Sequence, residues 1–114
     1  MTKNKNSTRY YSNKQEQTLA RILNASRVSN SGATRFGAGD VKSKGILFEC
    51  KTCVTHKKSF SIKKEWLEKN KEEAFAMGKD YAVLAFNFGP GQKNYYILDE
   101  KAFLAVKEIL DDGI

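Results

Sequence analysis

A short stretch near the middle of the chain limits the possible folds most, because its pattern is that of a β-hairpin. Residues 39–43 and 46–52 are two strand-like segments, and Lys44-Gly45 lies between them as a tight turn. A turn centred on these two residues pairs Asp40 directly with Glu49 across the two strands. The chain is therefore expected to build a β-sheet around this hairpin, with two carboxylates on one rung.

The two opposed carboxylates need a positive partner. Cβ atoms across such a rung lie about 4.5 to 5.5 Å apart, and like charges at this distance destabilise the pair. Side chains alternate along a strand, so Lys51 shares the face of Glu49, whereas Phe48 and Cys50 point to the opposite face. Two explanations follow. Lys51 neutralises the acids in a surface salt bridge, or the acids bind a hard divalent cation, Mg²⁺ or Mn²⁺, which prefers oxygen ligands.

A helix is expected before the hairpin, over residues 12–26, with Ser12 or Asn13 as its N-cap. The apolar positions that would face the core are Leu19, Ile22 and Leu23. Glu16 lies at the edge of this apolar stripe, where a carboxylate costs free energy unless it is paired or bound to a cation. Glu16 could therefore serve a cation site, or it could cap the start of its own helix.

The second half of the chain is predicted to supply scaffold. A helix would run from Ser59 or Ser61 to Met77, strands would follow at 81–88 and 94–98, and Asp99 would cap a closing helix. The residues expected to pack on the core are Ile62, Trp66, Ala74 and Met77 in the first helix, and Phe103, Val106, Lys107 and Leu110 in the closing one. This order predicts an α/β fold with a mixed central β-sheet flanked by α-helices.

Length and composition fit one cytoplasmic domain. At 114 residues and 40% hydrophobic content, residues 1–114 can form a single packed core, with residues 1–11 as a flexible basic arm. No apolar run is long enough to cross a bilayer, and the N-terminus lacks the apolar middle of a secretion signal. Two cysteines three positions apart are too few and too close for a disulfide framework, so reduced thiols are expected.

Positive charge is concentrated in the first half of the chain. Residues 1–57 hold 11 bases and 3 acids, a net +8, whereas residues 58–114 hold 9 bases and 10 acids, a net −1. Such asymmetry indicates a face that meets a polyanion, because phosphate contacts dominate the affinity of nucleic-acid-binding proteins. The alternative is a lysine-rich surface that only keeps the protein soluble. The three acids of this basic half are Glu16, Asp40 and Glu49.

The motifs resemble those of a known nuclease superfamily. They are Glu16 on a helix, then Ser29-Asn30-Ser31, Gly39-Asp40-Val41 and Phe48-Glu49-Cys50-Lys51. In this order and spacing they are similar to the PD-(D/E)XK nucleases, and within them to the archaeal-type Holliday junction resolvases and their phage-borne relatives. The likeness covers roughly residues 12–88, and Gly39 stands where the superfamily name expects proline. It implies a restriction-endonuclease-like core and a homodimeric endonuclease that acts on branched double-stranded DNA.

The same resemblance implies a role for each site residue. Asp40, Glu49 and the main-chain carbonyl of Cys50 would bind Mg²⁺, which Mn²⁺ could replace, and Glu16 would complete the site directly or through water. Lys51 would orient or deprotonate the attacking water, or stabilise charge on the phosphorus, and the acids around it favour the electrostatic role over that of a base. The implied catalytic residues are Glu16, Asp40, Glu49 and Lys51. No small-molecule cofactor is expected, and a phage-encoded copy would work in the host cytoplasm.

Basic and hydroxyl side chains around this centre are suited to phosphate contacts. Those expected to bind DNA are Arg9, Lys14, Arg21, Arg27, Ser29, Ser31 and Arg35. None of these contacts would read a base, so recognition of backbone shape is expected rather than recognition of sequence. Each of these residues could also be no more than a solvated surface residue.

Other assignments compete with a junction resolvase. Cys50, Cys53 and His56 offer three zinc ligands, but structural zinc takes four and the chain has no further Cys or His. A redox Cys-x-x-Cys pair would stand at the start of a helix, whereas Cys50 lies within a predicted strand. The remaining alternatives are a nicking or restriction-type nuclease on the same fold and a DNA-binding module that only retains the acids.

Overall fold

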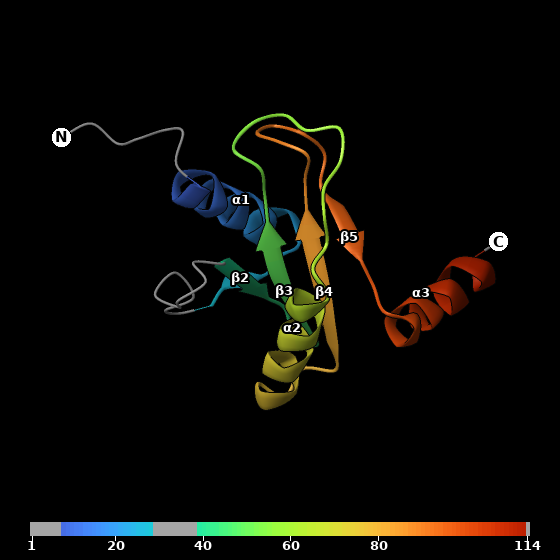
Figure 1. Cartoon of the computed structure of the whole chain (residues 1–114). Coiled ribbons are helices and arrows are strands. Elements are labelled where there is room, and N and C mark those ends of the chain that lie inside the picture. The colour runs from blue at the N-terminus through green and yellow to red at the C-terminus, as the bar shows by residue number, and fades with distance from the viewer. Residues whose placement is uncertain (1–7, 29–38, 114) are drawn as a thin grey trace.

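The protein is an α/β fold built on one mixed five-stranded sheet (Figure 1). The computed structural model describes residues 8–28 and 39–113. In chain order the elements are α1 (Thr8–Ile22), β1 (Ser26–Arg27), β2 (Gly39–Lys42), β3 (Ile46–Lys51), α2 (Lys64–Ala76), β4 (Tyr81–Phe86), β5 (Tyr95–Ile97) and α3 (Glu100–Asp112). The strands lie in the order β1-β2-β3-β4-β5, and only β3 and β4 run parallel. The predicted α/β class and mixed sheet are confirmed.

The predicted hairpin of β2 and β3 is present with the expected register. Asp40 lies opposite Glu49 across the two strands. The Ser43 N–H donates to the Ile46 carbonyl at 3.0 Å, which closes the turn between them. The register holds because a two-residue turn leaves the chain no freedom to shift one strand against the other.

Helix α2 is the connection that the parallel strands require. Neighbouring parallel strands need a crossover segment, and α2 returns the chain from the end of β3 to the start of β4. The buried Asn70 ties the helix to the sheet, because its Nδ2 donates to the Val83 carbonyl at 3.2 Å. The helix begins at Lys64 instead of Ser59 or Ser61, and it ends just before Gly78, whose φ of +72° suits glycine.

The hydrophobic core lies between α1 and one face of the sheet. The buried residues of this core are Leu19, Val41, Phe48, Cys50, Val83 and Ala85. Phe48 and Cys50 thus point into the core, as predicted, and the alternate positions of β3 face the side of the sheet that α2 covers. The sheet therefore separates an apolar layer under α1 from a layer that contains the acids.

Helix α1 differs from its prediction at both ends. It begins at Thr8, so residues 8–11 of the expected arm are helical, and Asn13 is an internal residue and not an N-cap. It ends at Ile22 because Asn24 adopts a left-handed φ of +51° and the Ala25 N–H bonds back to the Ala20 carbonyl at 2.8 Å. Ile22 is exposed, so its predicted place in the core is wrong.

Helix α3 is capped as predicted, but it does not pack as predicted. Asp99 Oδ1 accepts from the Ala102 N–H at 2.9 Å. Phe103, Val106 and Leu110 were expected to face the core, yet all three are exposed. Figure 1 shows the reason: α3 leaves the sheet directly after β5 and projects away from it.

None of the helices in the described part of the chain is both long enough and apolar enough to span a membrane.

Candidate active site

Asp40 and Glu49 form a buried acid pair in the middle of the hairpin. They lie opposite each other on β2 and β3, and only 9% and 7% of their surface is exposed. Within residues 8–28 and 39–113, the buried Oδ1 atom of Asp40 has no hydrogen-bond partner. Buried carboxylate oxygens are normally satisfied, because leaving one without a partner costs free energy. A purely structural role of the acid pair does not account for this unpartnered oxygen.

Lys51 forms an ion pair with this acid pair. Its Nζ lies 3.7 Å from Glu49 Oε1, and it lies 4.3 Å from the ring centroid of Trp66 on α2. The Lys51 and Glu49 side chains are only 17% and 9% exposed, so this is not a surface salt bridge. The carboxylate and the aromatic face together fix the ammonium group beside the acids.

Burial controls the protonation of the pair. It raises the pKa of Asp40 from 3.8 to about 8, and the charges of Glu49 and Glu73 raise it further than the charge of Glu16 does. Burial also raises the pKa of Glu49, although the neighbouring Lys51 opposes this shift. Asp40 therefore retains a proton at neutral pH unless a cation takes its place.

Helix α2 supplies a further acid that was not predicted. Glu73 acts electrostatically on both Asp40 and Glu49, so its charge lies on the same side of the sheet. It follows Trp66 and Asn70 at intervals of four and three residues, which places all three on one face of the helix. That spacing is visible in the sequence, but the sequence does not show that this face meets the hairpin.

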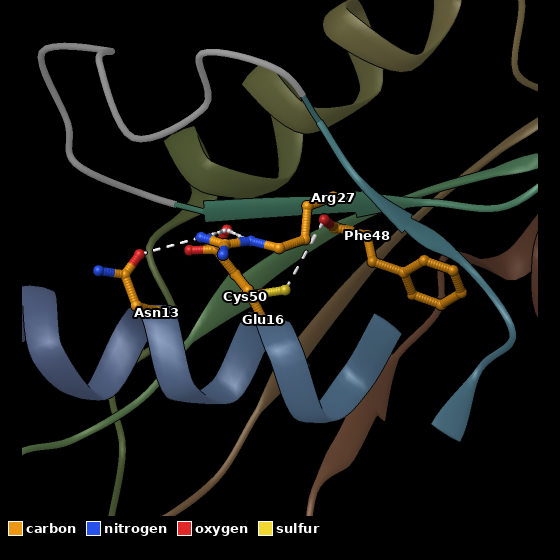
Figure 2. Close-up of polar contacts among 5 residues, drawn as sticks. All are labelled: Asn13, Glu16, Arg27, Phe48 and Cys50. Atoms are coloured by element: carbon orange, nitrogen blue, oxygen red, sulfur yellow. Dashed lines mark hydrogen bonds and ion pairs between the residues drawn. The ribbon is translucent and has the colours of Figure 1, made fainter. Parts of the chain in front are cut away.

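Glu16 lies apart from the pair, on the α1 side of the sheet. Figure 2 shows its carboxylate meeting the guanidinium of Arg27, which comes from β1, beside Cys50. Arg27 Nε and Nη2 donate to Glu16 Oε1 at 3.2 and 3.1 Å, and Nη2 also donates to Asn13 Oδ1 at 3.0 Å. Glu16 is only 2% exposed. In this structure its buried charge is balanced mainly by Arg27.

Of the three predicted carboxylates, two lie together, because Glu16 does not join Asp40 and Glu49. Among the residues that the structure describes, no group of three or more His, Cys, Asp or Glu side chains could hold a metal ion. The structure brings Asp40, Glu49 and Lys51 together and leaves Glu16 outside this group. Mg²⁺ is often bound through only one or two carboxylates, with water in its other positions. The unpartnered Asp40 oxygen and the hard oxygen donors fit such an ion.

The Glu16–Arg27 pair makes a testable prediction about folding. Arg27→Met leaves Glu16 buried without its main counter-charge, so we expect the free energy of unfolding to fall by about 2–3 kcal/mol. Adding Glu16→Gln should recover most of this loss, because the uncompensated charge is then removed. Urea denaturation of the wild type, the single variant and the double variant measures the effect. Equal losses in the single and the double variant would show that Arg27 stabilises the fold by packing alone.

Gln15 fixes the end of β3 and was not predicted. It is buried on α1, and its Nε2 donates to the Lys51 carbonyl at 2.7 Å. This bond joins the helix to the residue that carries the ammonium group of the site. The signal in the sequence that could have identified it was its spacing, because Gln15 lies four residues before Leu19 and therefore on the same face of the helix.

The predicted DNA-binding residues have different positions. Lys14 and Arg21 are exposed on α1, and neither forms an ion pair with another described residue. Arg27 is held by Glu16, as described above. Arg9 belongs to α1, but its side chain lies outside the described part of the structure, and Ser29, Ser31 and Arg35 lie outside the described residues altogether. The structure therefore places three of the seven at an accessible surface: Lys14, Arg21 and Arg27, of which Arg27 is paired with Glu16.

The cysteines do not form a second centre. Both thiols are free, and Cys50 is buried with its Sγ 4.0 Å from the Phe48 carbonyl (Figure 2). Burial raises the pKa of Cys50 well above 9.0, which opposes the thiolate that metal binding or redox chemistry needs. His56 Nε2 lies 3.0 Å from the Pro90 carbonyl, to which it donates. Cys50 can offer a cation only its main-chain oxygen.

Comparison of the chain with protein-family models, with curated proteins and with solved structures gives no match.

Proposed function

We propose that the protein is a metal-dependent, structure-selective DNA endonuclease with a restriction-endonuclease-like core of the PD-(D/E)XK type. Its substrate would be branched double-stranded DNA, in particular the four-way junction, and a homodimer would cut two opposed strands. One observation carries the proposal. Asp40 and Glu49 face each other in a buried position, with Lys51 fixed beside them and one carboxylate oxygen left without a partner.

Asp40, Glu49 and the main-chain oxygen of Cys50 are the groups that would hold Mg²⁺ or Mn²⁺. When bound, the ion supplies positive charge at the phosphodiester and makes a water easier to ionise. Asp40 must give up its proton for the ion to bind, since its pKa is raised to about 8. Glu16 would act on the site at longer range, through its charge and through α1.

Lys51 is suited to stabilise the transition state and not to act as a base. Its ammonium is held by Glu49 and by the ring of Trp66, which together place a positive charge beside the acid pair. A preorganised positive group beside the reacting phosphate is worth more in a water-poor site than in solution. Gln15 holds the main-chain carbonyl of Lys51, and Glu49 and Trp66 hold its ammonium group. Both the backbone and the side chain of Lys51 are therefore fixed in place.

The buried acids also favour an enzyme over a DNA-binding module that merely retains them. Burying two opposed carboxylates destabilises a fold, and it also repels a polyanionic ligand. A protein that only binds DNA gains nothing from this arrangement, whereas a cation-dependent nuclease needs it. The net +7 of the chain and the exposed Lys14 and Arg21 on α1 support a nucleic-acid substrate.

The proposal is tested by cleavage of end-labelled DNA. The protein is incubated with a four-way junction or with the linear duplex of one of its arms, in Mg²⁺ or in chelator. Symmetrical, Mg²⁺-dependent cuts near the branch are expected for the junction, and no cuts are expected for the duplex. Cuts in both substrates would indicate a nicking or restriction-type nuclease, and binding without cuts in Mg²⁺ or Mn²⁺ would contradict the proposed activity.

Lys51→Met should reduce the cleavage rate about a hundredfold while the junction affinity stays within about threefold, because the ammonium contributes mainly in the transition state. Lys64→Met, a change of the same kind at an exposed position on α2, serves as the control and should keep at least half of the wild-type rate. Single-turnover cleavage and gel-shift titration measure the two quantities. A Lys51→Met variant that cuts at the wild-type rate would exclude the role proposed for this residue.

A further inference from the structure

Helix α1 and the loops that follow β3 and β4 enclose a hollow of about 240 Å³, the loop hollow. It is lined by Tyr11, Lys14 and Gln15 of α1, by Thr52 after β3, and by the loop from Asn87 to Asn94. Figure 1 shows the loops after β3 and β4 side by side, and between them the Lys57 N–H donates to the Phe88 carbonyl at 2.7 Å. The protein alone therefore forms the walls of the loop hollow.

Gln15 leaves a buried hydrogen-bond acceptor at the wall of the loop hollow. Its Nε2 donates to the Lys51 carbonyl, which can only accept, so the orientation of the side-chain amide is fixed. Its Oε1 is buried and has no hydrogen-bond partner among residues 8–28 and 39–113. An amide oxygen buried without a partner costs free energy. This atom therefore favours a ligand that donates a hydrogen bond.

Asn94 supplies the complementary donor. The Gly89 N–H and the Thr52 hydroxyl both donate to Asn87 Oδ1, at 3.2 and 2.6 Å. Asn87 therefore directs its Nδ2 to Asn94, whose Oδ1 accepts at 3.3 Å. This chain of bonds also fixes the amide of Asn94 and leaves its Nδ2 without a partner in the described part of the chain. The loop hollow thus offers one acceptor and one donor to a ligand.

The size and charge of the loop hollow restrict that ligand. Sites for drug-sized ligands measure about 300–1,000 Å³, so a hollow of about 240 Å³ takes one small ring system. Of the described residues that line it, none is acidic, and the exposed Lys14 forms no ion pair with another described residue. Tyr11 and Pro90 contribute apolar surface. A flat ring with polar edges that carries an anionic group fits these features.

We infer that the loop hollow binds one unpaired nucleotide of the DNA, with its base against Gln15 and Asn94 and a phosphate at Lys14. The inference rests on the proposed DNA substrate. Each of the four bases has a donor next to an acceptor on its Watson–Crick edge, and this edge is free only in an unpaired nucleotide. The Tyr11 ring offers the base a face for stacking.

The loop hollow also accounts for selectivity towards branched DNA. A base that is already unpaired or poorly stacked is the easiest to take out of a helix, so a branch supplies such a nucleotide at lower cost than a continuous duplex. Gln15 bonds to the main chain of Lys51, and Thr52 follows Lys51 directly. A nucleotide in the loop hollow therefore lies next to the strand that carries the site.

Fluorescence anisotropy with a labelled duplex that contains a one-nucleotide bulge tests the inference. Chelator is present, so no strand is cut. The protein should bind this duplex at least about tenfold more tightly than the same duplex with an abasic residue in the bulge, because the abasic residue lacks the stacking and the hydrogen bonds of the base. Gln15→Leu and Asn94→Ala should each bring the two dissociation constants to within about threefold of each other. Circular dichroism verifies that each variant is folded.

Gln17→Leu is the matched control. Gln17 is exposed on α1, two residues from Gln15, and does not line the loop hollow, so this variant should keep the preference for the base. Equal affinities of the wild-type protein for the two bulged duplexes would overturn the inference, as would a loss of the preference in Gln17→Leu. Junction cleavage together with such equal affinities would leave the proposed function intact and exclude only the loop hollow.

A free deoxynucleoside monophosphate distinguishes the two sources of such a nucleotide. In millimolar excess it should displace less than half of the bulged duplex, because it lacks the phosphate contacts of the remaining DNA. Full displacement would assign the loop hollow to a free nucleotide and would overturn its role in DNA binding. Preference for the base without any junction cleavage would support the loop hollow and contradict the proposed activity.

Discussion

Asp40→Asn is expected to abolish cleavage of a four-way junction while the junction affinity stays the same or increases. The substitution removes one of the two carboxylates that would hold the cation, and the loss of such stabilisation corresponds to about a thousandfold or more in rate. It keeps the size of the side chain and removes a negative charge that faces the polyanion, so binding has no reason to weaken. Glu49→Gln should have the same effect. Single-turnover cleavage in Mg²⁺ and gel-shift titration in chelator measure the two quantities.

Glu72→Gln is the matched control for both substitutions. It removes the same charge from an exposed position on α2 and should cut at close to the wild-type rate. Parallel loss of cleavage and binding in Asp40→Asn would mean that the acid pair supports the fold or the DNA surface. Wild-type cleavage by that variant would remove Asp40 from the chemistry.

Asp40→Asn is also expected to stabilise the metal-free protein, and more so at high pH. The folded protein holds the Asp40 proton up to a pKa of about 8, whereas the unfolded chain releases it near 3.8. The wild-type protein therefore loses stability as the pH rises between these two values, and asparagine does not titrate. The gain should be small near pH 4 and on the order of 5 kcal/mol at pH 8. Urea denaturation in chelator at pH 5 and pH 8 measures it.

The pH dependence separates this effect from a general gain in packing. A gain of equal size at pH 5 and pH 8, or a loss of stability at pH 8, would contradict the raised pKa of Asp40. Glu72→Gln should show no such rise between the two values. Saturating Mg²⁺ should narrow the gap between wild type and Asp40→Asn, because an ion that binds only the wild-type folded state stabilises it.

The hairpin could be predicted from the sequence because its geometry is local. A turn of two residues determines which residues of β2 and β3 lie opposite each other, so the Asp40–Glu49 rung followed from counting. The alternation of a strand then placed Lys51 beside the acids and Cys50 in the core. No knowledge of distant contacts was needed for these three steps.

The surroundings of the acid pair could not be predicted, because they depend on how the helices pack. The position of Glu16 on a helix was visible, but its partner Arg27 comes from a strand that forms only when the sheet does. Likewise, the spacing of Trp66 and Glu73 shows that they share a face, while only the crossover of α2 brings that face onto the hairpin. The prediction of three carboxylates in one group was the part that depended most on such packing.

Helix α3 illustrates a second limit. Its apolar period and the Asp99 cap were sufficient to predict a helix, and both were confirmed. An amphipathic pattern indicates that one face of the helix packs on an apolar surface, but it does not indicate whether that surface belongs to the same chain. The exposed Phe103 and Ile109 show that it does not lie on the described part of this chain.

Titration with Mn²⁺ tests the central claim most directly. Calorimetry or electron paramagnetic resonance should detect saturable binding of about one ion per chain, without DNA, at pH 8. Asp40→Asn and Glu49→Gln should each weaken this binding at least tenfold, whereas Glu72→Gln should leave it unchanged. Binding that is absent, or that is equally strong in all four proteins, would contradict a cation held by Asp40 and Glu49.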